Sequence, residues 1–500
     1  MDFRKLFGLG GAPHAHTSAP LHLYNTLGAS LETFSLFPRA KEVRMYNCGP
    51  TVYGVQHIGN LSMFVFTDAL KRTLEYNGFK VKQVINITDF GHLAGDNEGD
   101  ADTGEDRMTK GLKRENLPIT MANMTQLAEK YAEIFIHDLK LLNVDTARIE
   151  FPRASAYISG QIAMIQTLLE KGYAYQTAHG VYFDTKRFAT YGALGRIDLA
   201  GQKEGARVQV NHEKRNPADF VLWKCDKKLG WESPWGLGFP GWHIECSAMI
   251  RSILGEQIDI HTGGIEHIPV HHNNEIAQSE AATGKKPLSR FWMHRAHIQI
   301  DGGKIAKSKG NAIILSDVVA QGYHPLALRY LFLGAHYRTS ANFSWEALAA
   351  SQTAFAKLVA ICIHYKDMDP GTVPKVWQEK FVQRINDDLD TPGAIAVMWD
   401  MVKDKSLSPQ DLIAGLIDMD EVLGLHLATP DASALKLARL EIKEEVALDD
   451  LTIGVRTLIT EREEARANKS WDKSDELRRE IEAAGYTLED ARDTTRVFKK

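Results

Sequence analysis

Two cysteines, one histidine and one glutamate stand in three short stretches whose residue types suit a metal ion. Cys48 ends the run MYNC, Cys246 lies in PGWHIECSAM, and PVHHNNEIAQ carries His271 and Glu275. The last two are four residues apart and would share one face of a helix. Thiolate, imidazole and carboxylate all bind zinc, and four of them complete a tetrahedral set. No C-x-x-C pair marks the site, however, so two buried cysteines beside a polar helix face explain the same residues.

A phosphate group could bind where the sequence HIGN, residues 57–60, follows a turn rich in glycine and proline. This stretch opens a predicted helix, and the first N–H groups of a helix attract anions. Gly59 would allow close approach of a nucleotide, and His57 could donate a hydrogen bond to a phosphate oxygen. An ordinary turn before a helix accounts for these residues equally well.

A second candidate for phosphate binding is the polar stretch DGGKIAKSKGN. A mobile loop with several lysines can close on a polyphosphate and stabilise the charge that develops during transfer. A solvated basic loop is the alternative explanation. The residues concerned are Lys304, Lys307, Ser308 and Lys309.

The elements around these motifs indicate a parallel sheet. LHLYNTL, EVRMYNC and KVKQVINITDF have the composition of strands, and residues 60–76 have apolar residues near helical spacing. A strand, a helix and a strand within about fifty residues form a βαβ unit. The turn from Cys48 to His57 would then lie at the carboxyl end of a strand, where open α/β sheets bind ligands.

The rest of the chain is expected to be more helical. Two helices and a hairpin around Gly180 predict an insertion, after which the sheet should resume at ADFVLWK and QIDIHTGG. Beyond about residue 315 the pattern is almost wholly helical, and a proline-containing stretch near residues 428–433 suggests a linker.

Composition limits the class of protein. The 500 residues suggest several domains, and 44% hydrophobic with 25% charged residues excludes a disordered, collagenous or coiled-coil chain. The net charge of -5 gives no overall attraction to nucleic acid. Four widely spaced cysteines, without a secretory signal or a long apolar run, predict a cytoplasmic protein that does not enter a membrane.

Taken together, the motifs resemble those of a class I aminoacyl-tRNA synthetase, and within that class the cysteinyl-tRNA synthetase family. The class signatures, of the types His-x-Gly-His and Lys-Met-Ser-Lys-Ser, read HIGN and KIAKS here. The resemblance extends from about residue 21 to about residue 490. It rests on MYNCGPTVYG, NPADFVLWK, PGWHIECSAM, GGIEHIPVHHNNEIAQSEAATG, GYHPLALRYLFLGAHYR and EARANKSWDKSDELRREIEAAGYTLED, which occur in the family's order.

The resemblance implies an α/β fold, with a class I Rossmann-type catalytic domain split by an insertion and followed by a helical bundle and a small anticodon-binding domain. The predicted segments are a flexible extension (1–20), the first half of the catalytic domain (21–115), the insertion (116–210), the second half (211–300), the KIAKS loop with a stem-contact region (301–345), the bundle (346–428) and the anticodon-binding module (429–500).

The family's functional residues carry over position by position. Zinc would be held by Cys48, Cys246, His271 and Glu275, and ATP by His57, Asn60, Lys304, Lys307 and Ser308. The nucleotide and amino-acid pocket would contain Gly49, Thr88, Trp242, His261, Gly263, Gly264 and Glu266. Anticodon bases would be read by Arg466, Asp475 and Asp490, since arginine pairs with guanine and carboxylates accept from base amino groups.

The implied reaction is ATP-dependent ligation of L-cysteine to tRNA(Cys) through cysteinyl-adenylate, with one Zn²⁺ per chain and Mg²⁺ bound with ATP. The resemblance also implies a monomer. No editing domain is expected, because a site that ligates a thiolate rejects serine unaided. Asn60 replaces the signature's second histidine, Glu266 replaces an aspartate, and KIAKS lacks the Met and first Ser. The rival hypotheses are a cysteine ligase with a non-tRNA amine acceptor and a non-catalytic paralogue that binds cysteine or tRNA.

Overall fold

The computed structural model describes residues 19–91, 93–94, 105–196, 214–300, 303–304, 312–365, 368, 371–438, 446, 448–490 and 495–499. The chain divides into two compact units, Met1–Ala434 and Leu435–Lys500. Residues 1–18 of the predicted N-terminal extension lie outside the described residues, as do Lys307, Ser308 and Lys309 of the predicted lysine loop.

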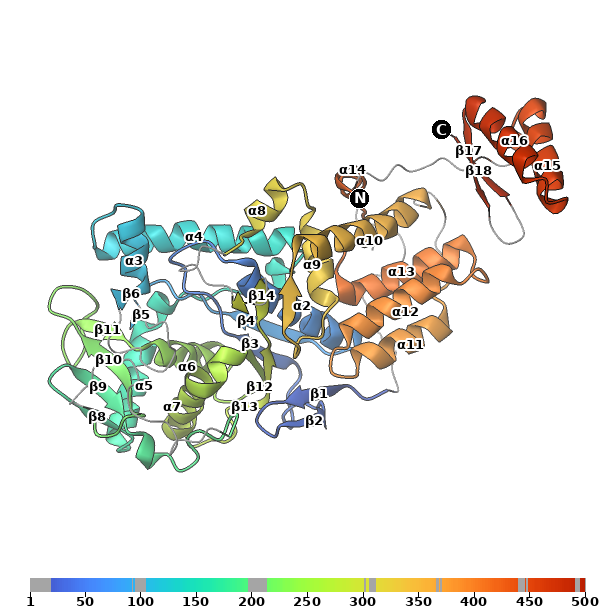
Figure 1. Cartoon of the computed structure of the whole chain (residues 1–500). Coiled ribbons are helices and arrows are strands. Elements are labelled where there is room, and N and C mark those ends of the chain that lie inside the picture. Colours follow the sequence, from blue (N-terminus) through green and yellow to red (C-terminus); the bar gives the residue numbers. More distant parts are fainter. Residues whose placement is uncertain are drawn as a thin grey trace. The chain divides into compact units, whose positions relative to one another are not determined.

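A five-stranded parallel sheet lies at the centre of the first unit (Figure 1). Its strands, in sheet order, are β13 (Ser289–Arg295), β12 (Ile258–Gly264), β3 (Val43–Asn47), β4 (Val81–Ile85) and β7 (Ile149–Glu150). After β3 the chain forms helix α2 (Ile58–Tyr76) and returns as β4, which confirms the predicted βαβ unit. β12 pairs with the other edge of β3, so the strand order reverses at β3 and creates a switch point at its carboxyl end.

Both faces of this sheet are covered, as expected for parallel strands. Val43 and Met45 of β3 face a cluster that includes Leu70 and Leu74 of α2. Tyr46, whose side chain points to the other face, belongs to the opposite cluster, which contains residues of α5 (Ile158–Glu170), α6 (Trp242–Ile253) and α7 (Asn273–Thr283). Helices α3 (Arg107–Arg114) and α4 (Met121–Leu141) contribute to a further cluster of their own.

The insertion contains a separate antiparallel sheet, and this corrects one prediction. Its strands are β11 (Gly238–Pro240), β10 (Phe220–Cys225), β9 (Gly180–Phe183) and β8 (Ala174–Gln176), in that order. ADFVLWK was expected to resume the parallel sheet, but Phe220–Cys225 pairs antiparallel with β9. The parallel sheet resumes only at β12. Four consecutive apolar residues in FVLW suit a buried strand in either sheet, and the partner strand is decided by contacts distant in sequence.

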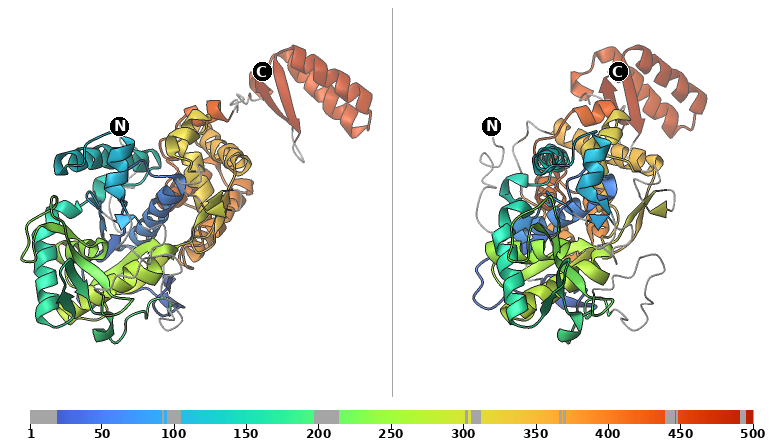
Figure 2. Two further views of the ribbon diagram at one scale, coloured as in Figure 1. Left: turned by 60° about the vertical axis from the view of Figure 1, so that its left-hand side comes forward. Right: turned by 90° about the vertical axis from the view of Figure 1, so that its left-hand side faces the viewer.

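The described residues from Leu315 to Leu437 are almost wholly helical, as predicted. Helices α11, α12 and α13 pack against one another (Figures 1 and 2). The side chains of Ser344, Asp390 and Ser408 accept backbone N–H groups and so cap the starts of α10, α12 and α13. The helices are α8 (Leu315–Ala320), α9 (Pro325–Leu333), α10 (Trp345–His364), α11 (Lys375–Ile385), α12 (Thr391–Lys403), α13 (Pro409–Leu423) and α14 (Ser433–Leu437).

Helix α10 is long and apolar enough to span a membrane by composition alone. It also packs against α9, and Phe355, Leu358 and Val359 are buried within the protein. The same composition is therefore explained by a core helix.

Several short strands complete the first unit. These are β1 (His22–Asn25), β2 (Ser30–Thr33), β5 (Leu93–Ala94), β6 (Glu105–Asp106), β14 (Ile298–Ile300), β15 (Gly303–Lys304) and β16 (Ala341–Phe343). β1 pairs with β2 and β5 with β6 as hairpins, whereas β14 pairs with both β15 and β16.

The second unit has its own small core. Helices α15 (Ile453–Ala467) and α16 (Trp471–Ala483) pack together and are followed by the hairpin of β17 (Tyr486–Asp490) and β18 (Thr495–Lys499). Its buried cluster comprises Leu451, Val455, Ile459, Ile481, Leu488 and Val497.

Candidate functional site

The four predicted metal ligands meet at the switch point of the parallel sheet. Cys48 directly follows β3, and its backbone N–H donates to the carbonyl of Thr262 in β12 at 3.1 Å. Cys246 comes from α6, and His271 and Glu275 come from the π-helical turn η5 (Ile268–His272) and from α7. The four ligand atoms lie within 4.8 Å of one another, and all four residues are buried.

Local structure explains how distant residues reach one point. His271 Nε2 lies 2.8 Å from Glu275 Oε1, as the four-residue spacing predicted. The Cys48 thiol donates to the same carboxylate oxygen at 3.7 Å. The π-helical turn before α7 turns His271 inward together with His272. The cluster is therefore an assembly of one strand end and two helices.

The electrostatics of the cluster suit a cation. Burial opposes the charge on His271, but the adjacent Glu275 carboxylate raises the histidine pKa to about 10. Burial likewise opposes ionisation of Glu275, yet His261 and His271 hold its pKa below the usual range. Burial raises the pKa of Cys48, whereas hydrogen bonds from Cys48 and His271 outweigh burial at Cys246 and lower its pKa.

These four donors fit zinc. Two thiols, one imidazole and one carboxylate in a water-poor pocket form a donor set that Zn²⁺ prefers, and a metal ion would displace the protons that the cluster otherwise shares. His243 supports this arrangement, because its Nδ1 lies 2.9 Å from His271 Nδ1 and so orients the ring of this candidate ligand.

Sequence reasoning missed several histidines next to the cluster. His272 Nε2 lies 3.3 Å from the Cys48 sulfur, and its Nδ1 shares a hydrogen bond with His294 at 2.8 Å. Cys48, His261, His272 and Glu275 form a second group of potential ligands with atoms within 4.8 Å. Burial lowers the pKa of both His272 and His294, which keeps these rings neutral. The adjacency of His271 and His272 was the one local signal for this group.

The residues expected in the amino-acid pocket surround the cluster. The Trp242 ring lies 4.4 Å from the His271 ring, and His261 stacks on Trp292 at 4.5 Å. Thr88 is buried, and its hydroxyl donates to Glu245 at 2.8 Å, so it supports the pocket through Glu245. Gly49 donates its N–H to the Asn86 side chain at 2.8 Å.

The remaining predicted pocket residues follow the end of β12. Gly263 lies beside the rings of His267 and His272, and a side chain there would meet both. Gly264 lies against the Glu266 carboxylate, which is 3.5 Å from His297 Nδ1. A side chain at either glycine would therefore collide with polar side chains beside the cluster.

The predicted phosphate site lies at the start of α2. His57 is the residue that caps this helix, because its Nδ1 accepts the N–H of Asn60 at 3.2 Å. The Asn60 amide donates to Gln56 at 2.7 Å. Ile58 N–H donates to the carbonyl of Ile313 at 2.8 Å, which brings the segment after the lysine loop against the first turn of α2. Of the loop residues, Lys304 is described only as part of β15.

The predicted anticodon residues all belong to the second unit. Arg466 lies in the last turn of α15, Asp475 lies on α16, and Asp490 ends β17. Trp471 begins α16 and is 58% exposed, so most of its ring is open to a partner.

Replacing Gly49 by alanine should distort the cluster and destabilise the first unit. The added methyl group would collide with the backbone carbonyl of Asn86, which cannot move aside like a side chain. Overpacking of this kind costs about 1–3 kcal/mol, measurable by thermal unfolding together with metal content. The control is Gly454→Ala in α15, where a methyl group meets nothing within 4 Å. Equal stability of both variants would contradict this account.

Comparison with known families agrees with the division into two units. Residues 36–353 match the model described as the catalytic domain of class I (C) tRNA synthetases. Residues 448–497 match the model of the cysteinyl-tRNA ligase anticodon binding domain.

Curated relatives match along almost the whole chain. Cysteine--tRNA ligase 1 of Burkholderia lata is 43% identical over 485 residues, which cover 96% of this chain and 97% of the relative. Cysteine--tRNA ligase of Treponema denticola is 38% identical, with 94% and 98% covered. Among solved structures, Mycobacterium tuberculosis methionyl-tRNA synthetase in complex with methionyl-adenylate shares the fold, with a TM-score of 0.52, 14% identity, and 80% and 93% covered.

Proposed function

Because this chain belongs to the cysteinyl-tRNA synthetase family, class I ligases that join cysteine to its tRNA, we propose that it activates L-cysteine with ATP at the switch point and transfers it to tRNA(Cys). The observation that carries this proposal is the meeting of four metal-ligand side chains at the sheet edge where α2 begins. The substrate sulfur and the ATP phosphates would thereby share one cleft.

Cys48, Cys246, His271 and Glu275 are the residues proposed to hold Zn²⁺. When bound, zinc supplies a Lewis acid that ligates the thiolate of the substrate cysteine and disfavours the hydroxyl of serine. His243 keeps His271 oriented, and Trp242 packs beside the same ring. The protein thus provides a rigid set of donors for Zn²⁺, which would bind one functional group of the substrate, its thiolate.

Activation requires positioning and charge stabilisation. The cysteine carboxylate attacks the α-phosphorus of ATP, which forms cysteinyl-adenylate and releases pyrophosphate. His57 and Asn60 at the start of α2 are proposed to bind the phosphates, and Lys304, Lys307 and Ser308 to close over them together with Mg²⁺. No side chain is assigned as an essential base.

Transfer follows when a terminal ribose hydroxyl of the tRNA attacks the activated carbonyl and releases AMP. Arg466, Asp475 and Asp490 are proposed to read anticodon bases, and the exposed Trp471 begins α16, the helix that carries Asp475. The match of residues 448–497 to an anticodon binding domain supports a tRNA acceptor over a small amine. We further predict a cytoplasmic monomer.

The test is transfer of labelled cysteine to tRNA bearing the cysteine anticodon, with ATP, Mg²⁺ and Zn²⁺ present. Charging that depends on all components would support the proposal. Cysteine-dependent exchange of pyrophosphate into ATP without charging would point to another acceptor. Loss of both reactions would favour a non-catalytic paralogue.

A further inference from the structure

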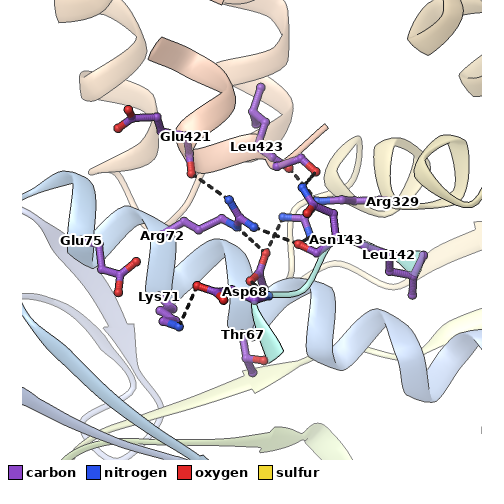
Figure 3. Close-up of polar contacts among 12 residues, drawn as sticks. Thr67, Asp68, Lys71, Arg72, Glu75, Leu142, Asn143, Arg329, Glu421 and Leu423 are labelled. Atoms are coloured by element: carbon purple, nitrogen blue, oxygen red, sulfur yellow. Dashed lines mark hydrogen bonds and ion pairs between the residues drawn. The ribbon is translucent and has the colours of Figure 1, made fainter. Parts of the chain in front are cut away.

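A buried carboxylate in the middle of α2 meets two arginines. Asp68 Oδ2 accepts from Arg72 Nε and from Arg329 Nη2, each at 2.6 Å. The Asp68 and Arg329 side chains are fully buried, and the Arg72 side chain is 12% exposed. Figure 3 shows the two guanidinium groups on either side of the carboxylate. Burial opposes the charge on Asp68, but the arginines more than compensate and lower its pKa.

The same arginines also bind carbonyl groups at the ends of two other helices. Arg329 donates to Leu423 O at 2.7 Å and to Leu142 O at 2.9 Å. Arg72 donates to Asn143 O at 2.9 Å and to Glu421 O at 3.3 Å. The last carbonyls of a helix lack partners within the helix, so these contacts satisfy the ends of α4 and α13. The Asp68 node, defined as Asp68, Arg72 and Arg329, therefore joins α2, α4, α9 and α13.

The node is an expensive way to hold helices together. Moving charges out of water is energetically unfavourable, and apolar residues of similar volume often stabilise such a position as well or better. Apolar contacts are not directional. A guanidinium group has several donors in fixed positions and therefore permits one arrangement of its acceptors. The node is thus better suited to setting a geometry than to adding stability.

The geometry that it sets concerns the ATP site. The first turn of α2 carries the proposed phosphate site, and α9 follows the lysine loop and α8 along the chain. Ile58 N–H in the first turn of α2 donates to the carbonyl of Ile313, which lies just before α8. Ten residues further along α2, Asp68 accepts from Arg329 of α9. Helix α2 is thus bound at two separate places to the segment that follows the lysine loop.

We propose that Asp68 and Arg329 are positioning residues for ATP, which hold the phosphate-binding turn of α2 in register with the segment that carries the lysine loop. This inference rests on the proposed function for its kinetic consequence. Its structural part, the rigidity of the first turn of α2, can be measured independently of any reaction.

The main test is Arg329→Lys. Lysine keeps a positive charge beside Asp68, but its single ammonium group cannot also reach Leu423 O and Leu142 O. We expect the KM for ATP in pyrophosphate exchange to rise about 10-fold or more, since small misplacements of reacting groups are costly. The KM for cysteine should change less than about 2-fold, because the metal cluster does not contact the node. Hydrogen exchange at the Ile58 amide should accelerate.

A matched control is Arg338→Lys. Arg338 Nε donates to the buried Asp388 at 2.6 Å, and neither residue lies on α2. This variant should leave the KM for ATP and the exchange at Ile58 unchanged. Should Arg329→Lys fail to fold, Arg72→Lys is the milder variant, because it keeps Arg329 with Asp68 and loses contacts to Asn143 O and Glu421 O. It should show a smaller change of the same kind.

The outcomes separate this inference from the proposed function. The inference would be overturned if the KM for ATP and the KM for cysteine rose equally, in proportion to a fall in melting temperature. Such a result would mean a merely structural role. Unchanged KM for ATP with unchanged exchange at Ile58 would also overturn it. A wild-type protein without cysteine-dependent pyrophosphate exchange would contradict the proposed function, and hydrogen exchange at Ile58 in the variants would then decide the inference by itself.

Discussion

Replacing Cys246 by serine should remove both the bound metal and the activation of cysteine. A serine hydroxyl is a much poorer zinc ligand than a thiolate, and three donors would remain of a set that lies within 4.8 Å. Loss of a supporting group already costs about 10–100-fold in metal affinity or activity, so loss of a direct ligand should cost at least about 100-fold. Elemental analysis of the purified variant and cysteine-dependent pyrophosphate exchange would measure the two effects.

Cys362→Ser is the matched control. Cys362 is also buried, in α10, and burial raises its pKa to about 12. Because it belongs to neither group of potential ligands in the described residues, this variant should keep its zinc and its activity toward cysteine. Full activation of cysteine by a metal-free Cys246→Ser protein would show that the proposed ligand set does not select the substrate.

The wild-type protein should activate cysteine about 10⁴-fold more efficiently than serine. The two amino acids differ in one atom, and a hydrophobic pocket distinguishes such pairs poorly. A site that bonds the distinguishing atom rejects the analogue strongly, because its own groups are left without a partner. The value of kcat/KM in pyrophosphate exchange, measured separately for cysteine, serine and alanine, would give the ratio.

The two glycine variants would test whether this selectivity comes from the metal cluster. Gly49→Ala, which leaves all four donors in the chain but displaces the end of β3, should reduce the preference for cysteine over serine along with the overall rate. Gly454→Ala should keep the wild-type ratio. A wild-type ratio below about 100 would contradict selection by thiolate ligation and would require correction of the product elsewhere.

Much of the catalytic domain follows from local patterns. The helix expected over 60–76 is α2 at Ile58–Tyr76, and QIDIHTGG forms β12. Such elements depend on side-chain periodicity and on residues close in sequence, so a single stretch contains the information for them. The spacing of His271 and Glu275 likewise predicted a contact that the structure has at 2.8 Å.

Other features depend on residues distant in sequence. FVLW was assigned to the wrong sheet, because an apolar run does not identify its partner strand. His272 and His294 became part of the site only through strands and helices brought together at the switch point. Asp68 stands in an ordinary helical pattern, and its partner Arg329 is 261 residues away.

The sequence by itself thus determined the βαβ unit around α2, strand β12, the family and the four candidate ligands. The tertiary structure decided which strands pair, how Cys48 meets Glu275 across 227 residues, and which buried charges face one another. The physical reason is range: helix periodicity and capping act over a few residues, whereas sheet pairing, metal geometry and burial of charge depend on the packing of the whole unit.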